Sequence, residues 1–329
     1  MTNKSVDTTY SRIIGTGSYL PETVLTNEVL SQRVDTNHEW IVERTGIHQR
    51  HLAAPQEGTG DLAYFAAQQA IEAANIDPET LDLIILGTTT PDRVYPATAC
   101  QLQHRIGANG CTAFDVQAVC SGFVYALSVA DNFIRCGDAR RALVVGADVH
   151  SRLLDWEDRA SCVLFGDGAG AVVLEADENP GIMSTHLQAD GNYESLLYIE
   201  GSVADGYDNA AAGPAKVRME GRDVFKLAVQ HLTATARETL AKHDLDCTDL
   251  DWLVPHQANR RIIQTVAKKL DLPLEKVVLT LDRQGNACAA SIPLALDAAV
   301  RDGRIKRGDL LLLEAFGAGF TWGSALIQY

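Results

Sequence analysis

One cysteine stands where a predicted strand ends and a predicted helix begins. Residues 111–116 form a short apolar run typical of a strand, and residues 122–135 carry apolar side chains at helical spacing. We therefore expect Cys120 at or near a helix N-terminus, where unpaired backbone N–H groups and the helix dipole favour thiolate over thiol. A thiolate is a usable nucleophile at neutral pH. The alternative is a buried structural cysteine, which is the usual fate of an intracellular cysteine.

Two other polar residues follow predicted strands in the second half of the chain. His256 comes directly after the apolar residues 252–255, and Asn286 comes shortly after residues 277–282. Sites in parallel α/β sheets form at the carboxyl ends of the strands, so we expect Cys120, His256 and Asn286 to converge on one cleft. Taken singly, His256 is more typical of a surface or core position, and Asn286 of a turn. Their joint placement carries the functional hypothesis.

These three side chains together suit acyl transfer. A thiolate takes an acyl group as a thioester, while a neutral imidazole Nε2–H and an amide NH₂ both donate hydrogen bonds. Two donors aimed at one carbonyl oxygen stabilise an enolate. Papain-like proteases also use the order Cys-His-Asn. Their local motif around the cysteine is absent here, and neither a secretory signal nor disulfide usage supports that class.

The elements that would position these residues repeat along the chain. A predicted helix, turn and strand over residues 62–88 has a counterpart over residues 223–256, and Asp82 and Asp251 lie 169 residues apart. The strands that begin at Ala142 and Leu311 have the same separation. Strands alternating with helices predict a largely parallel sheet that is covered by helices.

We therefore predict an α/β fold of two similar halves related by a pseudo-twofold axis. Residues 1–180 would form the half with the nucleophilic cysteine, and residues 181–329 the half with His256 and Asn286. A separation of 166 residues makes Asn286 the expected counterpart of Cys120 across this axis. Residues 190–220, rich in glycine and polar side chains, break the repeat and are predicted to form an insertion or long loop.

Composition limits the class of protein and its partners. The chain has 329 residues, 46% apolar and 22% charged, so we expect a packed core. We find no apolar run long enough to cross a bilayer and no secretory signal, and seven cysteines without a C-x-x-C pair are typical of free thiols. These features predict a cytoplasmic protein. A net charge of −15 argues against nucleic acid and anionic membranes as partners.

Several motifs in chain order resemble β-ketoacyl-acyl-carrier-protein synthase III, a family of thiolase-fold condensing enzymes. The resemblance covers nearly the whole chain, and its motifs lie at residues 13–21, 39–47, 118–123, 165–170, 256–263, 285–293 and 319–323. It implies a thiolase-like fold layered α-β-α-β-α, a homodimer, and catalysis without a metal or redox cofactor. The implied substrates are acetyl-CoA and malonyl-acyl carrier protein.

The resemblance also implies a mechanism. Acetyl-CoA would acylate Cys120, and His256 and Asn286 would hold the enolate that forms when the malonyl group loses CO₂. The product, acetoacetyl-acyl carrier protein, would begin fatty acid synthesis. The backbone N–H groups of Cys120 and Ala318 would hold the oxyanion. Ala318 stands where the family has a glycine, and its Cβ would cost on the order of 1 kcal/mol if that position required a positive φ.

Around the cysteine, the chain departs from the family pattern at one place and matches it at others. Residues 287–288 are Ala-Cys where the family more often has Thr-Ser, which adds a second thiol near the site. Trp40, Arg44 and Arg159 match positions that hold the adenine and phosphate end of CoA. Tyr95 matches a position that projects from one subunit toward the acyl pocket of the other, and a large aromatic residue there predicts a short primer such as acetyl.

A basic segment follows His256 in this acidic protein. Four positive charges between residues 260 and 269 have no acid among them, and helical spacing gathers them on one side. A solvated basic face is the ordinary explanation, but beside His256 we favour docking of an acidic carrier protein. The predicted docking residues are Lys226, Gln257, Ala258, Asn259, Arg260, Arg261, Lys268 and Lys269.

Three alternatives stay open at this point. A synthase of the same fold could load a longer, branched or aromatic acyl group in secondary metabolism. A catalytically idle subunit could bind carrier proteins, although the joint presence of Cys120, His256 and Asn286 argues against it. A cysteine hydrolase would turn over its substrate without a malonyl acceptor.

Overall fold

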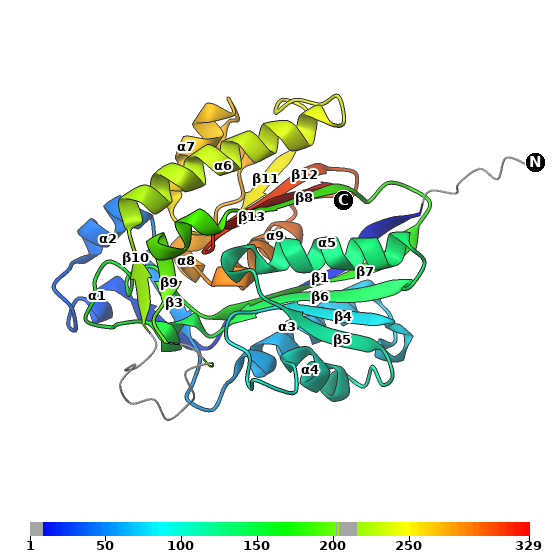
Figure 1. Ribbon diagram of the computed structural model, residues 1–329, viewed down its shortest axis with the longest axis horizontal. Helices are drawn as coiled ribbons and strands as arrows, with labels where there is room; N and C mark the ends of the chain where they lie inside the picture. Colours follow the sequence, from blue (N-terminus) through cyan, green and yellow to red (C-terminus); the bar gives the residue numbers. More distant parts are fainter. Residues whose placement is uncertain (1–8, 202, 204–215) are drawn as a thin grey trace, which may run out of the picture.

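Two β-sheets form the framework of the protein (Figure 1). A computed structural model describes residues 9–201, 203 and 216–329. The strand order is β1-β7-β6-β4-β5 in the first sheet and β11-β12-β13-β8 in the second. The strands of the first sheet are β1 (Tyr10–Tyr19), β4 (Leu83–Gly87), β5 (Thr112–Val116), β6 (Arg141–Asp148) and β7 (Gly168–Asp177). Those of the second are β8 (Ile182–Ala189), β11 (Trp252–Pro255), β12 (Leu310–Gly317) and β13 (Thr321–Gln328).

The two sheets share one topology. In the first, β7 pairs antiparallel with β1 and β6, and β4 pairs parallel with β6 and β5. In the second, β13 pairs antiparallel with β8 and β12, and β11 pairs parallel with β12. Strand orders and directions therefore match position by position, as the sequence repeat predicted.

Within the described residues, the second sheet has four strands and no full fifth strand. The strand predicted for residues 277–282 is wrong: Val277 makes only an isolated parallel bridge to Leu253, and the short helix α8 (Leu281–Gln284) follows. The reason lies in a side chain, because Oε1 of Gln257 accepts hydrogen bonds from the backbone N–H groups of Thr280 (2.9 Å) and Leu281 (3.2 Å). The side chain thus takes the place of a strand partner.

Helices cover both sheets and also separate them (Figure 1). Helices α3 (Thr59–Ala74) and α4 (Thr98–Ile106) pack on the outer face of the first sheet, and α6 (Gly221–Ala241) and α7 (Arg260–Lys269) on that of the second. Helices α5 (Gly122–Arg135) and α9 (Ser291–Arg301) lie between the sheets. The predicted thiolase-like α-β-α-β-α layering is confirmed. None of the helices in the described part of the chain combines the length and apolarity needed to cross a membrane.

Several smaller elements lie outside these layers. They are β2 (Thr23–Thr26), α1 (Asn27–Leu30), α2 (His38–Thr45), β3 (Gln49–Leu52), β9 (Leu197–Ile199) and β10 (Val217–Met219). The last two pair with each other inside the predicted insertion, of which residues 202 and 204–215 lie outside the described part. Among the others, α2 contacts α7 and β3 contacts α8.

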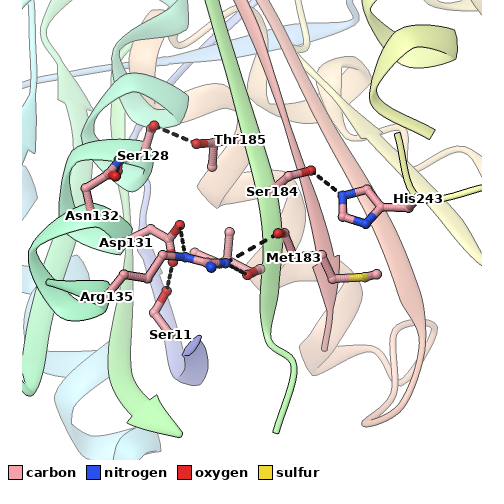
Figure 2. Close-up of polar contacts among 10 residues, drawn as sticks. Ser11, Ser128, Asp131, Asn132, Arg135, Met183, Ser184, Thr185 and His243 are labelled. Carbon is pink, nitrogen blue, oxygen red and sulfur yellow. Dashed lines mark hydrogen bonds and ion pairs between the residues drawn. The ribbon is translucent and has the colours of Figure 1, made fainter. Parts of the chain in front are cut away.

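Polar contacts tie α5 to β1 of the first sheet and to β8 of the second (Figure 2). Asp131 accepts hydrogen bonds from the Ser11 hydroxyl (2.5 Å) and from Nε of Arg135 (2.8 Å), whose guanidinium also donates to the Ile182 carbonyl (2.5 Å). One turn earlier, the hydroxyls of Ser128 and Thr185 lie 2.6 Å apart. Because buried polar groups are costly when unpaired, this paired set holds α5 in one position.

The turns before α5 and α9 correct one detail of the predicted symmetry. Both are 3₁₀ turns, η2 (Val119–Ser121) and η7 (Cys288–Ala290), and both begin with a residue in the left-handed region, φ +49° at Val119 and at Cys288. The backbone therefore matches residues 119 and 288. The counterpart of Cys120 is Ala289 rather than Asn286, because the repeat follows the turns and not the reactive side chains.

Candidate active site

Close backbone packing places Cys120. The thiol-bearing turn η2 follows β5 and leads into α5, as predicted, and Cys120 is 6% exposed. A Cβ on Gly87 would lie 2.6 Å from the carbonyl carbon of Gly122, so a glycine on β4 lets α5 begin directly against the sheet. A Cβ on Gly317 would lie 2.9 Å from the backbone nitrogen of Cys120. Two glycines thus support the turn from two sheets.

His256 lies at the carboxyl end of β11. Its backbone N–H donates to the Glu314 carbonyl on β12 (2.7 Å), and the residue is 5% exposed. Among the described residues, neither Nδ1 nor Nε2 has a hydrogen-bond partner although both are buried. Buried polar atoms are normally paired, so this imidazole is available to a bound molecule.

Asn286 is held through its oxygen. Its Oδ1 accepts a hydrogen bond from the backbone N–H of Cys288 (3.0 Å) and lies 3.5 Å from the Ser291 hydroxyl, which also donates to it. The Asn286 backbone is tied to Leu164 and Gly166 (2.9 Å each). The oxygen is engaged by the protein, whereas the amide NH₂ donates no hydrogen bond to any residue that the structure describes.

One cavity of ≈660 Å³ brings these residues together with the predicted CoA contacts. Its lining includes Cys120, His256, Asn286, Trp40, Arg44 and Arg159. The Arg44 guanidinium lies 4.7 Å from the centroid of the Trp40 ring, and that of Arg159 lies 5.0 Å from the same ring. Both arginines are exposed at the surface, so an aromatic face and two positive charges stand where the cavity opens to solvent.

The surroundings of Cys120 favour its thiolate. A hydrogen bond from the Cys288 thiol, whose Sγ lies 3.7 Å from Cys120 Sγ, and then the nearby His256 imidazole lower the pKa of Cys120 well below its ordinary value, against the opposing effect of burial. The cavity therefore holds a readily ionised thiol together with the His256 ring and the Asn286 amide, which can donate hydrogen bonds.

Two predicted site residues do not line this cavity. Tyr95 is 83% exposed and lies in a loop before α4. Ala318 is half-buried directly after Gly317. The positive φ in this loop belongs to Gly319 (+133°) and not to Ala318, so the predicted cost of a Cβ at Ala318 does not arise.

The predicted docking residues fall into two groups. Exposed side chains on α6 and α7 form a basic surface beside the cavity, and they are Lys226, Arg260, Arg261, Lys268 and Lys269. The prediction that Gln257 takes part in docking is wrong, because this residue is fully buried. Its Nε2 donates to the Pro255 and Val278 carbonyls, and its Oε1 accepts a hydrogen bond from the backbone at the start of α8. Asn259 caps α7 through Arg261 N–H (2.8 Å), and Ala258 lines the cavity.

The cavity lining also contains Glu314, which was not among the predicted site residues. It lies on β12 in register with Pro255, is fully buried, and neither carboxyl oxygen has a partner among the described residues. Burial raises the pKa of Glu314 to about 8, so the carboxyl is largely protonated at neutral pH. A single acid inside the apolar run 310–316 was the signal available in the sequence.

Glu314 makes stability depend on pH in a defined direction. The folded pKa of about 8 exceeds the ordinary value of 4.5, so the folded state binds more protons between these limits. Stability should therefore fall as pH rises through this window, by up to about 1.4 kcal/mol per pH unit. Glu314→Gln should remove this contribution to the pH dependence of the free energy of unfolding. Urea unfolding of both proteins at pH 5, 6, 7 and 8, roughly the span of the window, measures it. Equal slopes for wild type and variant would contradict the assignment.

Known proteins resemble this chain over almost its full length. The family model 3-oxoacyl-[acyl-carrier-protein] synthase III matches residues 114–191, and its C-terminal model matches residues 240–329. A β-ketoacyl-[acyl-carrier-protein] synthase III from Xanthomonas campestris pv. campestris is 61% identical over 320 residues, 97% of this chain and 98% of the relative.

Solved structures agree with the sequence comparison. The crystal structure of 3-oxoacyl-[acyl-carrier-protein] synthase III from Aquifex aeolicus superposes with a TM-score of 0.91 at 47% identity, covering 97% of this chain and all of the other. A priming β-ketosynthase from the R1128 polyketide biosynthetic pathway gives 0.93 at 36% identity, covering 97% and 96% of the two chains.

Proposed function

Because this chain belongs to the 3-oxoacyl-[acyl-carrier-protein] synthase III family, we propose that Cys120, His256 and Asn286 catalyse its reaction. The enzyme is a condensing acyltransferase that joins acetyl-CoA to malonyl-acyl carrier protein at the start of fatty acid synthesis. The observation that carries the proposed roles is that one cavity contains a thiol of lowered pKa together with a buried imidazole and an amide NH₂ that have no partner among the described residues.

The first half-reaction is transfer of the acetyl group to Cys120. The thiolate attacks the thioester carbonyl of acetyl-CoA, the C–S bond to CoA breaks, and CoA leaves as its thiol after taking a proton. We assign the oxyanion contacts to the backbone N–H groups of Cys120 and Ala318. Close support of Cys120 by Gly317 favours this assignment, since it brings the Ala318 segment beside the cysteine turn.

The second half-reaction is decarboxylation followed by condensation. The malonyl group loses CO₂, and the electron pair of the broken bond becomes a thioester enolate whose oxygen accepts hydrogen bonds from His256 and Asn286. The enolate carbon then attacks the acetyl-Cys120 carbonyl, and the Cys120 thiolate leaves as acetoacetyl-acyl carrier protein forms. Every electron pair is accounted for by thiol, thioester and carboxylate, so we propose that no metal or redox cofactor takes part.

We propose that Trp40, Arg44 and Arg159 receive the nucleotide end of CoA. The indole face offers stacking to a base, and the two guanidinium groups offer charge-assisted hydrogen bonds to phosphate.

We also propose residues 1–180 and 181–329 as the two halves, since the first sheet ends at Asp177 and the second begins at Ile182. All seven cysteines are free, which favours a reducing cytoplasm.

Tyr95 is proposed to limit primer length in a homodimer. Its ring is exposed in the single chain, as a residue that completes the pocket of a second subunit would be. Tyr95→Ala should raise use of hexanoyl-CoA relative to acetyl-CoA by about tenfold in kcat/KM, because the variant frees space for methylene groups. Tyr198→Ala, at another exposed tyrosine, is the matched control. An unchanged ratio in Tyr95→Ala would exclude this role.

The basic surface formed by Lys226, Arg260, Arg261, Lys268 and Lys269 is proposed to dock the acidic carrier protein. Reversing two charges in Arg260→Glu/Lys268→Glu should raise KM for malonyl-acyl carrier protein about tenfold, with a smaller salt dependence. Acetylation by acetyl-CoA should change little. The control is Lys306→Glu, because Lys306 is an exposed residue that precedes β12, at the opposite end of the second sheet. Equal effects on both substrates would argue against docking here.

Intact mass spectrometry tests the proposed function directly. After brief exposure to acetyl-CoA the protein should carry one acetyl group, which should disappear as acetoacetyl-carrier product forms on addition of malonyl-acyl carrier protein. Labelling by a longer or branched acyl-CoA but not by acetyl-CoA would favour the secondary-metabolism alternative. If no acyl-CoA labels the protein, Cys120 is not the nucleophile.

A further inference from the structure

A second thiol faces the proposed nucleophile across a short gap. Sγ of Cys288 lies 3.7 Å from Sγ of Cys120, and Cys288 is completely buried. A thiol is a weak hydrogen-bond donor toward a neutral acceptor, but a bond to an ionised acceptor is about twice as strong. Cys288 is therefore close enough to act on the charged form of Cys120.

The backbone around Cys288 is fixed on both sides. Its own N–H donates to Oδ1 of Asn286 (3.0 Å), and the N–H of Ala289 donates to Oδ2 of the buried Asp148 (3.0 Å). The residue itself has φ +49°, a left-handed conformation that non-glycine residues adopt at a cost and only where surrounding contacts impose it. The position of this thiol is thus determined by the same contacts that hold the Asn286 amide.

Polar groups also surround Cys288 near the buried Asp148 carboxylate. Asp148 Oδ1 accepts hydrogen bonds from Thr88 Oγ1 (3.1 Å), the Thr89 N–H (2.7 Å) and Thr90 Oγ1 (3.1 Å). The hydroxyl of Thr89 lies 3.8 Å from Cys288 Sγ and can donate to it. A sulfur that receives a hydrogen bond from this side is free to donate on the other side.

The groups around the two thiols favour the ionised form of Cys120 and the protonated form of Cys288. The titratable groups that face them are His256, His150 and Asp148. The hydrogen bond with Cys120, burial, the negative charge of Asp148 and a hydrogen bond to that carboxylate raise the pKa of Cys288 well above its ordinary value. Cys288 therefore remains a thiol under conditions in which Cys120 is ionised.

We propose that Cys288 is a positioning residue that donates its S–H hydrogen bond to the Cys120 thiolate, holding the sulfur ionised and in place for attack. The inference rests on the proposed role of Cys120 as the nucleophile. It gives one residue contact with both the nucleophile and the Asn286 amide, because the backbone N–H of Cys288 orients that amide while its thiol contacts Cys120.

Titration of Cys120 in two variants tests the proposal. Ultraviolet absorbance of the thiolate, measured as the difference from the same protein with Cys120→Ser, gives the apparent pKa. Cys288→Ala, which removes the donor, should raise this pKa by about one unit and slow alkylation by iodoacetamide about tenfold at a pH below both values. Cys288→Ser keeps a donor in the same place and should restore both readouts. Cys136→Ser, at an exposed cysteine, is the control for thiol content.

The outcomes separate this inference from the proposed function. If acetyl-CoA acetylates wild-type Cys120 but Cys288→Ala leaves its pKa and alkylation rate unchanged, the positioning role is overturned while the function stands. A serine variant whose Cys120 pKa rises by a full unit overturns it as well, and this result is available even if the alanine variant does not fold. Failure of every acyl-CoA to label wild type would instead overturn the proposed function.

Discussion

Cys120→Ser is expected to abolish condensation and to leave decarboxylation of malonyl-acyl carrier protein measurable. A serine hydroxyl is not ionised at neutral pH, whereas the Cys120 thiol has a pKa held well below its ordinary value. Acetoacetyl-carrier formation should therefore fall by about 10³-fold or more. Release of CO₂ should persist, because His256 and Asn286 still line the cavity. Acetyl transfer by intact mass and CO₂ release from labelled malonyl-carrier substrate measure the two steps separately.

Cys136→Ser provides the matched control for this experiment. Cys136 caps the far end of the same helix α5 and is exposed, so its replacement should leave both half-reactions unchanged. Condensation that survives in Cys120→Ser at more than a few per cent of the wild-type rate would contradict acyl transfer through this residue. Loss of CO₂ release together with condensation would indicate that the thiol also binds the malonyl substrate.

The sequence was sufficient for features that depend on local pattern. The apolar run before Cys120 and the helical spacing after it predicted β5 and α5. The strand before His256 predicted its place at the carboxyl end of β11, because a buried strand and a turn are encoded by consecutive residues. The residues assigned to CoA, Trp40 and the two arginines, came from the family resemblance, and the structure places them at one cavity mouth.

Features that depend on long-range pairing were not predictable in the same way. Gln257 belongs to a motif beside His256, but its side chain satisfies the backbone of residues 278–281 and so ends a strand that periodicity predicted to continue. The contact between Cys120 and Cys288 joins residues 168 positions apart through two facing turns. Burial of Glu314 follows from helix α6 lying over β12, which no local pattern encodes.

His256→Ala and Asn286→Ala are each expected to lower decarboxylation of malonyl-acyl carrier protein by about 10²–10³-fold, since each removes one donor to the enolate oxygen. Asn286→Ala should still form acetyl-Cys120, because no charge near the thiolate is lost. His256→Ala should acetylate more slowly, since the imidazole contributes to the depressed pKa of Cys120. Pre-steady-state acetylation and CO₂ release distinguish these effects.

The double variant His256→Ala/Asn286→Ala decides whether the two donors act on one oxygen. Donors that share an acceptor in one transition state depend on each other's geometry, so the combined loss should be well below the product of the single losses. Multiplicative losses would mean that His256 and Asn286 serve different atoms or different steps. Their separate anchors support a shared acceptor: β11 fixes the histidine backbone and Cys288 N–H fixes the amide oxygen, which leaves each with a donor turned toward the same cavity.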